Sequence, residues 1–148
     1  MPHSVSLRKG RLSLTSHIYL LTATVENRQA IFADLAPARL LIRELYNAQA
    51  SGLAESLAWV VMPDHLHWLV SLQQGSLSEL MGRVKGRSAS QVNRRLGRRG
   101  RLWQEGFHDR ALRREEDILP TARYIVANPL RAGLVTRIGD YPFWDAVW

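Results

Sequence analysis

The stretch Leu57-Ala-Trp-Val-Val-Met-Pro-Asp-His-Leu-His-Trp-Leu-Val-Ser-Leu72 contains two short apolar runs separated by a turn. Leucine, alanine, tryptophan, valine and methionine fill residues 57–62, and the apolar pattern resumes over residues 66–72. Proline followed by aspartate at positions 63 and 64 is typical of a turn. The stretch therefore predicts two antiparallel strands joined as a hairpin.

Strand and helix patterns flank this hairpin. Residues 17–25 are rich in β-forming side chains and predict a strand. Residues 34–50 carry apolar side chains at the 3.6-residue period of an amphipathic helix. After the hairpin, Ser76-Leu-Ser-Glu79 is a capping box that begins a helix reaching about residue 96, and Gly97 suits its C-terminal cap.

The second half of the chain predicts one more strand and one more helix. Residues 102–112 are expected to be strand-like, and residues 117–127 helical with Pro120 in the first turn. Asn128-Pro129 is expected to end this helix, because the residue before proline avoids the helical region. The order of elements predicts an α+β fold: a ferredoxin-like antiparallel sheet with helices packed on one face.

Length and composition narrow the class of protein. The 148 residues, 46% hydrophobic and 22% charged, suit one folded domain over residues 1–148. Residues 1–15 are a basic N-terminal segment, and residues 141–148 are an aromatic tail expected to dock against the core. The absence of cysteine excludes disulfides and thiolate chemistry. No apolar run suits a membrane span or a secretory signal, so we expect a cytoplasmic protein with no membrane partner.

Positive charge is concentrated in one part of the sequence. The net charge is +7, and only two of the twenty basic residues are lysine; the pI is near 10.7. Arginine pairs bidentately with phosphate, so this excess favours nucleic-acid binding. A high genomic GC content or a solvated basic helix face would also produce it. Eleven basic residues against two acidic ones lie between residues 83 and 114: Arg83, Lys85, Arg87, Arg94, Arg95, Arg98, Arg99, Arg101, Arg110, Arg113 and Arg114.

His65 and His67 flank Leu66 in the second predicted strand. Side chains alternate across a sheet, so both imidazoles are expected on one face and Leu66 on the other. Two neutral imidazoles side by side suit a divalent metal. A pair of surface or hydrogen-bonded histidines is the alternative.

Tyr124 and Asn128 are four residues apart in the last predicted helix, hence on one face and about one turn apart. Asn128 lies where Pro129 is expected to end the helix, which would leave its amide oxygen free to turn toward an ion. Taken separately, Tyr124 also suits a core tyrosine with a bonded hydroxyl, and Asn128 a simple helix-ending residue.

These residues lie in motifs that resemble a known family. Residues 60–70, Val-Val-Met-Pro-Asp-His-Leu-His-Trp-Leu-Val, resemble the His-hydrophobe-His (HUH) motif of single-tyrosine transposases. Residues 122–135, Ala-Arg-Tyr-Ile-Val-Ala-Asn-Pro-Leu-Arg-Ala-Gly-Leu-Val, resemble the tyrosine helix of the REP-associated tyrosine transposases, abbreviated RAYTs. Residues 102–110 and 10–32 also match that family's pattern. The resemblance covers the chain from about Arg8 to Asp140 in the right order.

The resemblance implies a mechanism. It implies a ferredoxin-like core and a Mg²⁺ or Mn²⁺ ion that polarises the scissile phosphate of single-stranded DNA. Carried over, Tyr124 on the C-terminal helix is the nucleophile, giving a 5′-phosphotyrosine and a free 3′-OH. His65 and His67 are metal ligands, and Asn128 is the polar third ligand.

Other residues are candidates for supporting roles. Asp64 stands where the family commonly has asparagine; it either shapes the turn or adds a carboxylate near the ion. His108 either pairs within a strand or serves the site. In RAYTs the N-terminal segment contributes to reading a tetranucleotide beside a hairpin, which here implies Arg8, Lys9 and Arg11, otherwise a basic tail. Further candidate DNA contacts are Arg83, Lys85, Arg87, Arg94, Arg95, Arg110 and Arg113.

The main hypothesis is a bacterial, nucleoid-acting, metal-dependent endonuclease and strand transferase for hairpin (REP-like) single-stranded DNA, expected to be monomeric. A dimeric insertion-sequence transposase of the same chemistry is the second hypothesis. Its relatives share the Pro-Asp-His sequence seen at Asp64, but they carry glutamine where Asn128 stands. A catalytically silent nucleic-acid-binding protein is the third, and the presence of His65, His67, Tyr124 and Asn128 together argues against it.

Overall fold

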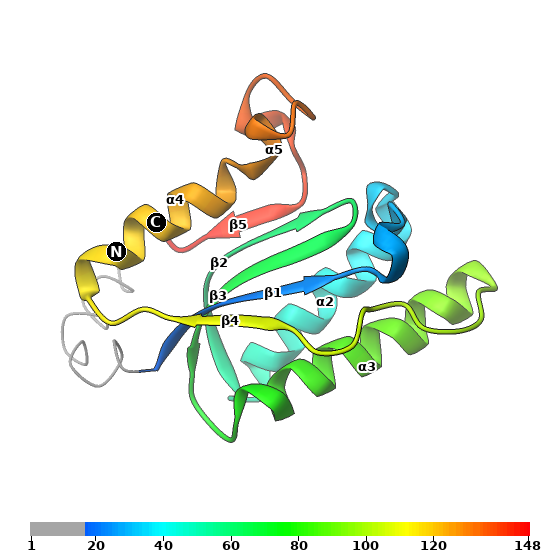
Figure 1. Cartoon of the computed structure of the whole chain (residues 1–148), viewed down its shortest axis with the longest axis horizontal. Coiled ribbons are helices and arrows are strands. Elements are labelled where there is room, and N and C mark those ends of the chain that lie inside the picture. The colour runs from blue at the N-terminus through cyan, green and yellow to red at the C-terminus, as the bar shows by residue number, and fades with distance from the viewer. Residues whose placement is uncertain (1–16) are drawn as a thin grey trace.

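The predicted hairpin is the centre of a five-stranded antiparallel sheet (Figure 1). The computed structural model describes residues 17–148. In it β2 (Ala54–Met62) and β3 (His65–Leu72) are joined through residues 63 and 64 and pair from end to end, with one irregularity at Leu57. The strand order is β4-β1-β3-β2-β5, so β3 is the central strand of the sheet and β2 lies directly beside it.

β1 (Ile18–Thr24) lies between β3 and β4 (His108–Ala111). Thr22 is directly opposite His67 on one side and His108 on the other. Because residues directly opposite one another in a sheet point to the same face, these three side chains form one row across it. The strand predicted over residues 17–25 is thus present almost to its ends.

The strand predicted over residues 102–112 is shorter than expected, because only His108–Ala111 pairs as β4. Residues 102–107 form a loop that turns at Gly106, where φ is +77°. Trp103 makes an isolated bridge with Val25, and its indole N–H donates to Ser88 Oγ at 3.0 Å. The buried Leu102 and Trp103 side chains hold this loop in the core, so its apolar residues reflect burial and not strand pairing.

Two long helices cover the face of the sheet that carries Leu66 and Trp68. These are α2 (Leu35–Ala50) and α3 (Leu77–Leu96), which also pack against each other. The Tyr46 ring of α2 meets Trp59, the cross-strand neighbour of Trp68, edge to face at 6.2 Å. The capping box at Ser76 is present, and the chain leaves α3 through Gly97 at a left-handed φ of +65°. The predicted α+β fold with an antiparallel sheet is confirmed, but the helices do not all pack on one face as predicted, because the helix over Ile118–Val126 lies on the opposite side of the sheet (Figure 1).

The last helical segment differs from the expected single helix. α4 (Ile118–Val126) packs against β2, β3 and β5, with Pro120 in its first turn. α4 ends just before Asn128-Pro129, as predicted, but a second short helix that was not predicted, α5 (Asn128–Arg131), begins there. Proline lacks an N–H and is well tolerated in the first turn of a helix, so it can begin one after a break. The break at Ala127 turns α5 relative to α4, which Figure 1 shows at the upper end of α4.

The C-terminal segment extends the sheet beyond β2. β5 (Trp144–Ala146) pairs with β2, and Tyr141 and Phe143 are buried. The Tyr141 hydroxyl donates to the carbonyl of Val61 at 2.5 Å, and burial raises the pKa of this phenol to about 12. Short 3-10 turns complete the chain at Glu26–Arg28 (η1), Ile31–Ala33 (η2), Glu115–Asp117 (η3) and Ile138–Asp140 (η4). Among residues 17–148, no helix combines the length and apolar character that a membrane span requires.

One buried carboxylate joins α2 to α3. Glu44 is only 1% exposed, and it accepts hydrogen bonds from Arg87 Nε and Gln91 Nε2, both at 2.8 Å, and from Asn47 Nδ2 at 3.2 Å. Burial acts to raise the pKa of Glu44, but the bonds from Gln91 and Arg87 and the charge of Arg87 outweigh it, so the pKa is lowered. The stabilisation by Glu44 is thus present above the unfolded pKa and is lost as the pH falls through the folded one.

Replacing Glu44 with alanine should destabilise the protein by about 1–3 kcal/mol. The change leaves the amide groups of Gln91 and Asn47 without their acceptor, while Arg87, which is 51% exposed, can hydrate. Urea unfolding followed by circular dichroism measures the effect. Glu105→Ala removes an exposed glutamate and should change the free energy of unfolding by less than about 0.5 kcal/mol. Equal effects of the two substitutions would contradict a structural role of Glu44.

Candidate active site

His65 and His67 lie side by side near the start of β3. Their ring centroids are 4.8 Å apart with the ring planes at 79°, while Leu66 between them is buried on the opposite face. This is the arrangement predicted from the alternation of side chains along a strand. It presents two imidazoles from one rigid element of the central sheet.

The ring of His65 is oriented by a carboxylate. Its Nδ1 lies 2.7 Å from Asp64 Oδ1, and the other oxygen, Asp64 Oδ2, accepts from Arg28 Nε at 3.0 Å. Burial acts to raise the pKa of Asp64, but the hydrogen bonds and charges of His65 and Arg28 outweigh it and lower that pKa. An ionised carboxylate only accepts hydrogen bonds, so Nδ1 of His65 carries a proton and Nε2 is the ring atom that points away from Asp64. A metal-binding histidine commonly donates its second ring N–H to a carboxylate, and Asp64 occupies that position beside His65.

His67 is held by a hydroxyl. Its Nδ1 lies 2.8 Å from Oγ1 of Thr22, directly opposite on β1. Burial, the neighbouring His65 ring and the positive charge of Arg131 lower the pKa of His67 from 6.5 to about 4. Its imidazole is therefore neutral near pH 7, as a metal ligand must be.

Asn128 reaches the histidines from the other side of the site. It is the first residue of α5, and its amide nitrogen lies 3.3 Å from His65 Nε2. Since Nδ1 of His65 is protonated, the amide donates and Nε2 accepts. The amide oxygen faces away and accepts from Arg131 Nη2 at 3.4 Å. A half-turn of the amide would exchange the two atoms and bring the oxygen toward the histidines.

Tyr124 lies on α4, one turn before Asn128, and is 62% exposed. The Arg131 guanidinium carbon lies 3.8 Å from the centroid of its ring, a cation–π contact. Within residues 17–148 the Tyr124 hydroxyl has no hydrogen-bond partner, and the core tyrosine considered as an alternative is therefore not what the structure shows. Arg131 contacts both Tyr124 and Asn128, and its charge acts on His67.

The donor set suits a divalent ion. His65 and His67 each bond through Nδ1, which leaves both Nε2 atoms as potential ligands, and Asn128 adds an amide that can supply an oxygen. In the described part of the chain, no three histidine or acidic side chains gather in a metal-holding group. Asp64 is not counted as a third ligand, because its two carboxylate oxygens already bond to His65 and Arg28. Two histidines and one amide are thus the candidate ligands.

Comparison with known proteins assigns the chain that carries this site to a family. The family described as "Transposase IS200 like" matches residues 13–128, which include both histidines, Tyr124 and Asn128. The chain belongs to this family. A REP-associated tyrosine transposase of Escherichia coli (strain K12) is 32% identical over 88 residues, covering 58% of this chain and 50% of the relative. The resemblance to the RAYTs is thereby confirmed.

Solved structures show the same fold. A REP-associated tyrosine transposase bound to a REP hairpin matches with a TM-score of 0.72 and 25% identity, over 87% of this chain and 76% of that one. A crystal structure of a protein from Deinococcus radiodurans matches with a TM-score of 0.56 and 23% identity, over 73% and 87% of the two chains. The chain spans about half the length of the curated relatives it matches.

In this IS200-like chain, the face of the sheet that carries His65 and His67 continues across β1 and β4. His108 lies in the same row as Thr22 and His67, two strands from His67, and Arg110 lies on the same face opposite Leu20. All four residues of β4 are exposed. The structure thus places His108 on the histidine face but not in contact with the histidine pair.

The predicted DNA-contact residues of this IS200-like chain do not form one surface. Lys85 donates from Nζ to the carbonyls of Gln104 and Gly106, and Arg87 is paired with Glu44. Arg83, Arg94 and Arg95 are exposed on α3, whereas Arg110 and Arg113 flank the start of α4. Arg8, Lys9 and Arg11 lie outside the described residues.

Arg131 is the site residue that the sequence reasoning missed. It lies three residues after Asn128, within the motif quoted for the tyrosine helix. Spacing of three in a helix puts it on the same side as Asn128, and this was the available signal. Thr22 was also missed, because its contact with His67 depends on the register of β1 against β3.

Proposed function

We propose that this protein is a metal-dependent single-stranded DNA endonuclease and strand transferase that acts on hairpin, REP-like DNA through a 5′-phosphotyrosine. The observation that carries the proposal is the pair of side-by-side histidines, whose Nδ1 atoms bond to Asp64 and Thr22 and whose Nε2 atoms are therefore potential metal ligands. The family, and a relative whose structure was solved bound to a REP hairpin, support the choice of substrate. Such a substrate would place its work at the bacterial nucleoid.

His65 Nε2, His67 Nε2 and the Asn128 amide oxygen would hold the ion, Mg²⁺ or Mn²⁺. When bound, the ion would polarise the scissile phosphate and stabilise charge on the leaving oxygen. The protein prepares these ligands in advance: Asp64 fixes the proton of His65 on Nδ1, and burial keeps His67 neutral. The two histidines then need little reorganisation before binding, whereas the Asn128 amide must turn to present its oxygen.

Tyr124 would supply the nucleophile. Its phenolic oxygen forms a bond to phosphorus while the bond from phosphorus to the 3′-oxygen breaks. The phenol loses its proton to the surroundings and the leaving 3′-oxygen takes one up, giving a 5′-phosphotyrosine and a 3′-OH. Because the phosphodiester energy is kept in the tyrosine ester, attack by a 3′-OH reverses the step and joins DNA. The exposed ring of Tyr124 leaves room for a DNA strand to approach.

Arg131 would stabilise the charge that develops on phosphate. Arg131→Ala should lower the single-turnover cleavage rate by about 10²-fold while DNA binding changes little, because one guanidinium is lost next to the reacting atoms. Gel assays with a labelled hairpin measure the rate. Arg137→Ala is the control, since Arg137 is an exposed arginine that pairs with its near neighbour Asp140. A rate in Arg131→Ala equal to that of the control would remove Arg131 from the site.

The proposal is tested by incubating the protein with end-labelled hairpin DNA and Mg²⁺ or Mn²⁺, followed by denaturing electrophoresis. We expect a protein–DNA adduct that survives denaturation and disappears on nuclease digestion. Binding of the hairpin without any adduct or cleavage in either metal would overturn the proposed enzyme and leave a nucleic-acid-binding protein. Solution mass addresses assembly: we propose a monomer, and a stable dimer would favour an insertion-sequence type of enzyme.

A further inference from the structure

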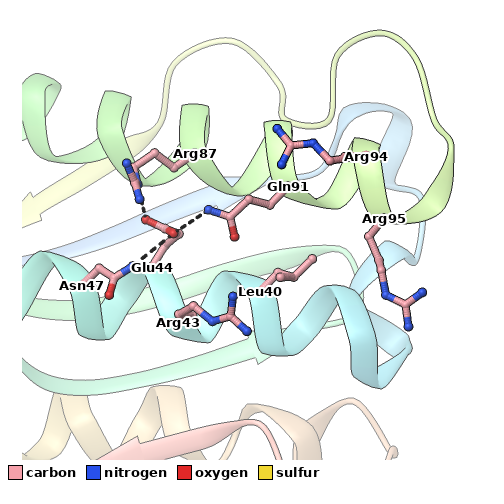
Figure 2. Close-up of a pocket in the computed structure, with 8 residues that line it drawn as sticks. All are labelled: Leu40, Arg43, Glu44, Asn47, Arg87, Gln91, Arg94 and Arg95. Atoms are coloured by element: carbon pink, nitrogen blue, oxygen red, sulfur yellow. Dashed lines mark hydrogen bonds and ion pairs between the residues drawn. The ribbon is translucent and has the colours of Figure 1, made fainter.

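A groove of about 630 Å³ runs between α2 and α3 (Figure 2). It lies on the outer side of the two helices, which cover the sheet face opposite His65 and His67. Four arginines line it, Arg43 from α2 and Arg87, Arg94 and Arg95 from α3. The groove is therefore separate from the candidate active site.

The floor of the groove presents an unpaired acceptor. Gln91 Nε2 donates to the buried Glu44 carboxylate at 2.8 Å, and this fixes the amide, because the reverse orientation would bring two oxygens together. Gln91 Oε1 is consequently turned away from Glu44, as Figure 2 shows, and it is buried without a hydrogen-bond partner in the described structure. A buried acceptor in this state favours a ligand that carries an N–H or O–H.

The walls of the groove carry unneutralised positive charge. Arg87 is paired with Glu44 and so cancels the one acidic residue in the lining. Arg43, Arg94 and Arg95 are exposed, and none of them has an ion pair or hydrogen bond to another side chain within residues 17–148. Three free guanidinium groups on two facing helices suit the phosphates of a chain that lies along the groove.

We propose that this groove is a second nucleic-acid site, which binds a single strand of DNA. Arg43, Arg94 and Arg95 contact its phosphates, and a base amino or imino group donates to Gln91 Oε1. An unpaired strand fits because its base edges are free to enter a concave groove, whereas those of a duplex are paired. The choice of DNA rests on the proposed function, and the site would hold DNA beyond the segment that is cleaved.

The test measures binding of fluorescent single-stranded oligonucleotides by anisotropy, in a Tyr124→Phe background so that no cleavage occurs. Arg43→Glu, Arg94→Glu and Arg95→Glu combined should weaken binding at least 10-fold. The same change should reduce the slope of log affinity against log salt by about 2, because each neutralised phosphate of a single strand accounts for roughly 0.7 of that slope. Arg39→Glu, Arg99→Glu and Arg137→Glu combined is the matched control, since it makes the same change in net charge at exposed arginines outside the groove.

Two further measurements separate the roles within the groove. Oligonucleotides with abasic positions should bind the parent protein more weakly than normal ones, and Gln91→Met should reduce that difference. In the unmutated protein, single-stranded DNA should protect Arg43, Arg94 and Arg95 from phenylglyoxal, read by mass spectrometry, while Arg39 stays reactive. The protection measurement needs no variant, so it shows whether DNA occupies the groove even where a substituted protein misfolds.

Binding by the triple groove variant equal to that of its control, or unprotected groove arginines, would overturn the second site. Adduct formation by Tyr124 on a minimal hairpin would be unaffected by that result. Conversely, failure of the unmutated protein to form an adduct would overturn the proposed enzyme and leave the anisotropy and protection measurements interpretable.

Discussion

Tyr124→Phe is expected to abolish DNA cleavage and the covalent adduct together. Phenylalanine keeps the ring against which Arg131 packs but lacks the oxygen that would bond to phosphorus. Loss of a nucleophile typically costs on the order of 10⁶-fold in turnover, so no product should be visible. Hairpin binding should persist, because neither the arginines nor the histidines are changed. Denaturing electrophoresis for the adduct and anisotropy for binding give the two readings.

The matched control for this variant is Tyr46→Phe. Tyr46 is also an exposed tyrosine on a helix, and its hydroxyl bonds to Asp145 at 3.1 Å, on the side of the sheet away from the histidines. It should cleave at the rate of the unmutated protein. If the Tyr124→Phe protein still forms an adduct, another residue is the nucleophile and the assignment of Tyr124 is wrong.

The double change His65→Ala and His67→Ala is expected to remove both metal binding and metal-dependent cleavage. It deletes two of three proposed ligands, and the Asn128 amide alone cannot hold a divalent ion. Titration with Mn²⁺, followed calorimetrically, should show binding to the unmutated protein and none to the variant. Cleavage with Mg²⁺ or Mn²⁺ should fall below detection.

His17→Ala is the control for the histidine changes. His17 is exposed just before β1, and among residues 17–148 its backbone carbonyl accepts from the N–H of Leu72 while its side chain has no partner. Its removal should leave Mn²⁺ binding and cleavage unchanged. Cleavage that persists in the double variant with the same dependence on metal would show that the ion binds elsewhere. Urea unfolding of the double variant and of His17→Ala checks that both proteins are folded.

The elements that follow simple periodicity could be predicted from the sequence. The hairpin, its antiparallel pairing and the common face of His65 and His67 all follow from alternation along a strand and from the turn at residues 63 and 64. The capping box at Ser76 has its own local signature, and it was found where expected. The short helix α5 after the break at Ala127 could not be predicted, because proline both ends helices and begins them.

The contacts within the site depend on packing that local patterns do not contain. The bond between Thr22 and His67 needs the register of two strands 45 residues apart in sequence. The position of Arg131 over the ring of Tyr124 depends on how α5 turns away from α4. The basic stretch of residues 83–114 was one feature in the sequence, but the fold divides it between α3 and the approach to α4.

The hydrogen bond between Arg131 and the amide oxygen of Asn128 has a thermodynamic consequence. If that oxygen is the one an ion requires, then Arg131 and the ion compete for a single acceptor. Ion binding would release the guanidinium toward a phosphate, and a phosphate that attracts the guanidinium would free the oxygen for the ion. Linkage makes such effects reciprocal, so DNA should raise the affinity for the ion by the same factor as the ion raises the affinity for DNA. One shared acceptor would thus make the two ligands cooperative, and the protein alone would hold either of them weakly.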